Sequence, residues 1–124
     1  MQRILLVGFA GLVGTLVRFG LSGWADQKWG GSFPTGTLLV NLTGCLLAGF
    51  LFNSLEERYL VDPVIRTTVL VGFLGGFTTF SSYGLQTFNL LRDGEVFFAA
   101  MNMILSNVAG LLFVWAGYTL SRSL

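Results

Sequence analysis

The sequence predicts an all-α membrane protein in which each subunit has four transmembrane helices and the third helix is broken. Hydrophobic residues make up 53% of the 124 residues and charged residues only 10%, whereas about 25% of a soluble domain is charged. The mean hydropathy of +0.74 agrees with this contrast. The few charged residues divide the chain into four apolar blocks, so we expect one transmembrane domain over residues 1–124.

The four blocks cover residues 4–24, 34–55, 66–91 and 96–120. Each is long enough to cross a bilayer, which takes about 20 apolar residues in a helix. All six acidic residues fall between the blocks, as expected because a charge at the bilayer centre costs at least about 2.5 kcal/mol on insertion scales. Pro34 and Pro63 stand near the starts of the second and third blocks, where a missing N–H does little harm.

Charge and composition exclude several classes of function. A net charge of +1 argues against a broad basic surface for nucleic acid, and the chain has no histidine to ligate a metal or shuttle protons. Cys45 is the only cysteine, so no disulfide forms within the chain. No Asp, Glu or His lies inside a block. Passive conduction is therefore favoured over enzymatic turnover or ion-coupled transport.

The orientation in the membrane is weakly specified by the Lys and Arg residues. Four lie on the side that holds both termini, and three lie on the other: Arg3, Arg58, Arg66 and Arg122 against Arg18, Lys28 and Arg92. Such a small difference gives the positive-inside rule little to act on. Either one charge fixes the orientation, or the chain inserts both ways and two opposite copies pair about a two-fold axis.

The third block contains the most informative stretch. Gly75 and Gly76 each cost about 1 kcal/mol against alanine in a helix, and the β-branched Thr78 and Thr79 follow them. We expect the span to unwind at its midpoint. Irregular backbone at that depth must be covered by protein or line a watery cavity. The freed carbonyls could hold a cation there, and the N-terminus of the resumed half-helix could hold an anion. The alternative is a packing kink.

Beyond the predicted break, hydroxyl and amide donors recur at helical spacing at Thr79, Ser82 or Tyr83, and Gln86. Such a line could replace water around a permeating anion. Phe80 and Tyr83 lie three residues apart, and their ring edges carry partial positive charge. Either ring taken alone is more often ordinary packing.

Polar residues in the other blocks leave two interpretations open. Asn41 offers two N–H donors that suit an anion, or it ties two helices together. The same choice applies to Asn102, Ser106 and Asn107 in the fourth block. Arg18 either extends its charge to the interface or supplies positive potential at the mouth of a vestibule.

Three motifs, taken together, resemble the Fluc, or CrcB-type, family of bacterial fluoride channels. They are residues 14–18 (Gly-Thr-Leu-Val-Arg), 36–44 (Gly-Thr-Leu-Leu-Val-Asn-Leu-Thr-Gly) and 75–81 (Gly-Gly-Phe-Thr-Thr-Phe-Ser). The resemblance runs over essentially the whole chain. It implies an antiparallel, dual-topology homodimer in the bacterial inner (plasma) membrane, with two pores that export fluoride passively and a structural sodium ion on the two-fold axis.

The resemblance also implies roles for individual residues. The backbone carbonyls of Gly75 and Thr78 from both subunits would hold the sodium ion. The fluoride pathway would be formed by Asn41, Phe80, Ser81, Ser82, Tyr83, Arg18 and Ser106. Tyr83 departs from the phenylalanine usual at its position, and its hydroxyl could bond fluoride or obstruct it.

Two other functions remain open. Small multidrug-type exporters also have four spans and often dual topology, but they generally rely on a membrane carboxylate, which the first block lacks. The second is a non-transporting scaffold or accessory subunit of a membrane complex.

Overall fold

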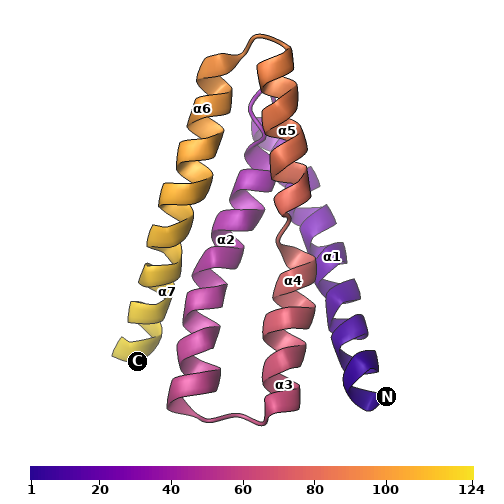
Figure 1. The fold of residues 1–124 in the computed structure, drawn as a ribbon, viewed down its shortest axis with the longest axis vertical. Coiled ribbons are helices and arrows are strands. Elements are labelled where there is room, and N and C mark those ends of the chain that lie inside the picture. Colours follow the sequence, from indigo (N-terminus) through magenta and orange to yellow (C-terminus); the bar gives the residue numbers. More distant parts are fainter.

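Four long helical spans run alternately up and down and are joined by short connections, so both termini lie at the same end (Figure 1). The computed structural model describes residues 1–124. Each span is long and apolar enough to cross a membrane: Gln2–Trp29, Thr35–Arg58, Pro63–Arg92 and Val96–Ser123. The predicted all-helical fold with four spans is confirmed.

Each span after the first is built from consecutive helical segments. The first is α1 (Gln2–Trp29), and the second is α2 (Thr35–Phe52) followed by the π-helical η1 (Asn53–Arg58). The third contains α3 (Pro63–Thr67), the π-helical η2 (Thr68–Phe73), α4 (Leu74–Phe77) and α5 (Phe80–Arg92). The fourth contains α6 (Val96–Ile104), the π-helical η3 (Leu105–Ala109) and α7 (Gly110–Ser123).

The helices extend further than the apolar blocks predicted. Block 4–24 becomes a helix that ends only at Trp29, and Asp26 lies in its last turn. The Asp26 carboxylate accepts the Gly36 N–H at 2.8 Å, which joins the end of α1 to the start of α2. Asp62 similarly caps α3 by accepting the Val64 N–H at 2.8 Å. Charged residues at the ends therefore continue or cap the helices. The apolar blocks did not predict these extensions, because hydropathy reports which residues lie in the membrane and not where a helix ends.

Close backbone approach holds the bundle together at glycines. A Cβ at Gly14 of α1 would collide with the carbonyl of Phe73, and one at Gly117 of α7 would collide with the carbonyl of Leu46. Small residues let helices pack tightly where lipid removes the hydrophobic drive between them. The first span is thus fixed to the third, and the fourth to the second, which lies between α4 and α7 in Figure 1.

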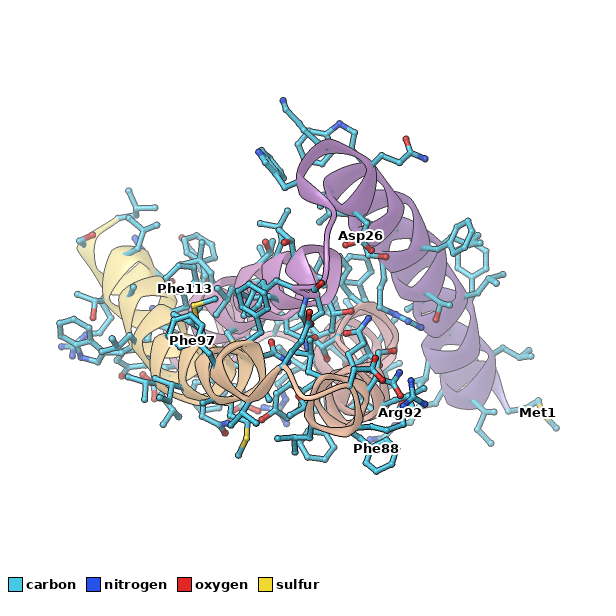
Figure 2. The ribbon with its side chains drawn as sticks, turned by 90° about the horizontal axis from the view of Figure 1, so that it is seen from above. Met1, Asp26, Phe88, Arg92, Phe97 and Phe113 are labelled. Carbon is cyan, nitrogen blue, oxygen red and sulfur yellow. The ribbon has the colours of Figure 1, made fainter.

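Most large apolar side chains remain on the surface of the single chain. Phe19 is 79% exposed, Phe80 82% and Leu111 74%. Figure 2 shows apolar side chains projecting outward around the bundle, with Phe88 on the outer side of the third span. Such a surface needs lipid or another protein to cover it.

Candidate functional site

The helical backbone of the third span is interrupted at two threonines. Phe77 is the last residue of α4, and Phe80 is the first of α5. Between them Thr78 (φ −88°, ψ 157°) and Thr79 (φ −147°, ψ 114°) are extended. Gly75 and Gly76 keep helical geometry in α4, so the interruption lies on the two threonines that follow the glycines and not on the glycines themselves. Extended geometry suits the β-branched threonines.

Side chains take the place of the helical hydrogen bonds at the interruption. The Thr79 N–H donates to Asn41 Oδ1 at 2.8 Å instead of to the carbonyl of Gly75, its helical partner. The Ser82 N–H donates to Thr79 Oγ1 at 3.2 Å instead of to the carbonyl of Thr78. The carbonyls of Gly75 and Thr78 therefore lose their helical partners, and these are the two oxygens predicted to hold a cation.

Asn41 is fixed by a two-point contact with Thr79. Besides accepting the Thr79 N–H, its Nδ2 donates to the Thr79 carbonyl oxygen at 2.9 Å. An asparagine amide carries two N–H donors, so one remains for another partner. The helix-tying role and the donor role left open by the sequence are therefore compatible in one side chain.

Arg18 contacts the same interruption from the first span. Its Nε donates to the carbonyl of Gly76 at 3.0 Å, and Thr15 Oγ1 approaches that oxygen at 3.4 Å. A cation at the C-terminal end of α4 is favourable for the helix dipole. Arg18 lies within α1, which continues to Trp29, so about three helical turns separate it from the end of that helix.

A groove of about 900 Å³ opens beside the interruption, between the second, third and fourth spans. Most of the predicted site residues line it: Asn41, Gly75, Thr78, Phe80, Tyr83 and Ser106. Arg18, Ser81 and Ser82 do not. The two serines lie in the first turn of α5, where the Thr79 hydroxyl lies 3.1 Å from Ser82 Oγ and 3.5 Å from Ser81 Oγ.

Two aromatic rings form one wall of the groove. The ring centroids of Phe80 and Tyr83 lie 5.6 Å apart with their planes inclined at 49°. Opposite them in η3, Asn107 donates from Nδ2 to the Tyr83 phenolic oxygen at 3.3 Å. The sequence marked Asn107 only as a polar residue of undecided role, because its contact with α5 depends on how the two spans pack.

A buried polar contact fixes the third span to the fourth. Asn102 is 2% exposed, and its Nδ2 donates to Thr87 Oγ1 at 2.9 Å. Thr87 in turn donates to the carbonyl of Tyr83 at 2.8 Å. Asn102 therefore takes the helix-tying role of the two that the sequence allowed. Ser106 stays on the groove wall, and its hydroxyl lies 3.5 Å from Asn102 Oδ1.

A second, smaller hollow of about 460 Å³ lies at the far end of α5. Gln86 lines it together with the acidic residues Asp26, Asp93 and Glu95. Of the predicted line of donors along α5, Thr79 and Tyr83 therefore border the groove, and Gln86 borders this hollow. No group of three or more His, Cys, Asp or Glu residues is placed to hold a metal ion.

Comparison with known proteins gives a consistent family assignment. Residues 5–118 match the model of the family described as CrcB-like protein, Camphor Resistance (CrcB). A protein of Desulforapulum autotrophicum named fluoride-specific ion channel FluC is 43% identical over 121 residues, which cover 98% of this chain and 97% of the relative. Proteins with the same name from Citrifermentans bemidjiense (40% over 124 residues, 100% of both chains) and Pseudomonas putida (44% over 119 residues, 96% of both) are also similar.

Proposed function

Because this multi-pass membrane protein belongs to the CrcB-like family, we propose that it is a passive fluoride-selective channel that exports fluoride across a bacterial inner membrane. The observation that carries the proposal is the extended Thr78–Thr79 segment, around which fixed donors gather in the middle of a span. Fluoride gives up its hydration shell only where a pore supplies donors in its place. No chemical turnover is involved.

Several groups at the interruption suit that task. Asn41 is held rigidly by Thr79 and keeps one N–H for the ion. The Phe80 ring is 82% exposed, so its positive edge is open to an anion. Ser81 and Ser82 lie at the N-terminus of α5, whose dipole favours negative charge. Arg18 adds positive potential from the first span, and Ser106 adds a hydroxyl from the fourth.

A structural sodium ion is the second part of the proposal. The carbonyls of Gly75 and Thr78 are free of helical bonds and border the groove, and no carboxylate cluster competes for the ion. Hard cations prefer several oxygen ligands, and one chain provides too few here. A second copy related by a two-fold axis would supply the same two oxygens and complete the shell.

The third part is an antiparallel, dual-topology homodimer. The small difference in Lys and Arg between the two sides permits both insertions. The space beside Gly75 is open, since a Cβ there would meet nothing within 4 Å. The apolar surface around the groove needs a cover. A second copy covers it, brings the sodium ligands together and closes two symmetric pores.

Flux from proteoliposomes tests the channel. Liposomes loaded with potassium fluoride should release fluoride, followed with a fluoride electrode after a potassium ionophore is added, while liposomes loaded with chloride should retain it. Equal release of both ions would refute selectivity. Proton-coupled uptake of a cationic dye would instead support the exporter, and no flux together with a stable hetero-complex would support the scaffold. Protein-free liposomes serve as the control.

A further inference from the structure

We propose that the phenolic O–H of Tyr83 binds the permeating fluoride directly in the groove, and that Asn107 is the positioning residue that aims it. The inference rests on the proposed function, because it specifies an additional contact along the same pathway. It decides between the two roles that the sequence left open for the Tyr83 hydroxyl, which were to bind the ion or to block it.

The hydrogen bonds of Asn107 settle which atom of the pair donates. Its Nδ2 donates to the carbonyl of Met103 at 2.8 Å, which fixes the orientation of the amide because a carbonyl can only accept. The other Nδ2 hydrogen points to the Tyr83 oxygen at 3.3 Å. Tyr83 is thus the acceptor in this contact, and its own hydrogen points elsewhere.

That phenolic hydrogen has no acceptor within the chain. The bond from Asn107 is the only hydrogen bond of the Tyr83 hydroxyl within the chain, and Tyr83 borders the groove beside Phe80. The Asn107–Tyr83 pair is exposed at the groove, so the phenolic hydrogen can reach an acceptor there. The hydrogen bond that it accepts also polarises its O–H and makes it a better donor. An anion in the groove is the acceptor that this arrangement fits.

A second tyrosine in the same groove shows the contrast. Tyr118 borders the groove from α7, but its hydroxyl donates to Glu57 Oε2 at 2.7 Å. The Tyr118 proton is therefore already committed to a carboxylate. Of the two tyrosines, only Tyr83 presents a free O–H to the groove.

The fourth span holds Asn107 in place for this contact. Asn107 lies in η3, and π-helical turns are frequent at functional sites because they shift side chains out of the regular helical register. The buried bond between Asn102 and Thr87 fixes the neighbouring turn of α6 against α5. The distance between Asn107 and Tyr83 is thus set by a rigid contact rather than by a mobile loop.

Tyr83→Phe tests the inference because it removes only the hydroxyl and keeps the ring. We expect fluoride efflux at concentrations below saturation to fall about tenfold, as for the loss of one hydrogen bond to a charged group. Tyr59→Phe, in the exposed connection after η1, should leave the rate unchanged. An unchanged or faster rate in Tyr83→Phe overturns the inference, and a faster rate identifies the hydroxyl as an obstruction.

Asn107→Leu tests the positioning role. Its efflux should also fall, and the double variant should be no slower than Tyr83→Phe alone, because both changes act on one contact. Elution volume and unfolding temperature should match the wild type in each case. Additive losses overturn the role of Asn107. If the wild type releases no fluoride, the proposed function fails, whereas a conducting wild type with an equally fast Tyr83→Phe overturns only this inference.

Discussion

Arg18 of α1 donates from Nε to the carbonyl oxygen of Gly76, 3.0 Å away, at the end of α4. In a continuous helix that carbonyl would accept the N–H of Phe80, but the extended threonines separate the two halves of the third span. Arg18 therefore satisfies a backbone oxygen that the interruption leaves at membrane depth, where an unsatisfied carbonyl costs several kcal/mol. The first span thereby stabilises the site on the third.

Arg18→Leu should lower the stability of the folded chain by about 1–3 kcal/mol, because the Gly76 carbonyl loses its charged donor. Thermal unfolding in detergent measures the effect. Arg3→Leu is the matched control, since Arg3 also connects the first and third spans, but through an exposed 3.2 Å bond to Thr67 Oγ1. Equal losses of stability in the two variants would show that the Gly76 contact stabilises the fold no more than the exposed Arg3 contact does.

Asn41→Asp should reduce fluoride efflux by about tenfold or more, since it replaces the Nδ2 donor with a charged oxygen. That oxygen would face the Thr79 carbonyl, which Nδ2 now contacts at 2.9 Å. The fluoride electrode measures the flux, and size-exclusion chromatography should show an intact dimer. Gln27→Glu adds the same charge in the last turn of α1 and should conduct normally. Normal efflux in Asn41→Asp would remove Asn41 from the pathway.

Phe80→Ile should suppress fluoride efflux and leave the dimer assembled. The ring is 82% exposed in the single chain, so its removal takes little packing from the fold, but it removes the aromatic edge from the groove. Phe88→Ile is the control, because Phe88 is also on α5, is 59% exposed and lies on the outer side (Figure 2). If both variants conduct equally, the Phe80 ring does not take part in permeation.

Gly75→Val should shift the protein from dimer to monomer on size-exclusion chromatography. Within the chain a Cβ at Gly75 meets nothing within 4 Å, and valine is a better helix former than glycine, so the fold itself should persist. The new side chain would instead keep the partner's carbonyls away from the sodium ion. Gly8→Val, at an equally open position of α1, should remain a dimer. A dimeric Gly75→Val would place Gly75 away from the two-fold axis.

The four spans could be predicted because the free-energy cost of a charge inside the bilayer dominates their placement. Charge is so costly inside a bilayer that the gaps between charged residues define the membrane segments, and the observed spans cover these segments except for Pro34. The helix ends could not be predicted in the same way. Asp26 and Asp62 end or begin helices through capping bonds to Gly36 and Val64, and hydropathy does not contain those contacts.

The candidate site was predictable in its residues more than in its geometry. Asn41 stood out because polar groups are rare in the apolar blocks, and Phe80 and Tyr83 stood out because they lie at helical spacing beyond the predicted break. The interruption was predicted near the midpoint of the third span, from the low helix propensity of the glycines and the β-branched threonines that follow them. The observed position depends on Asn41 and Thr79, whose side chains offer the backbone replacement bonds. These partners come from other turns or another span, so propensity alone does not locate them.

By itself the sequence determined that this chain crosses a membrane four times and carries its polar groups in the middle of the third span, because the distribution of charge and of glycine is a local property. Only the tertiary structure decided that Arg18 reaches Gly76, that Asn41 holds Thr79 and that Asn107 reaches Tyr83. Each of these contacts joins two different spans, through residues at least 24 positions apart in the sequence. Their formation depends on how closely the helices approach, which is set by packing at residues such as Gly14 and Gly117.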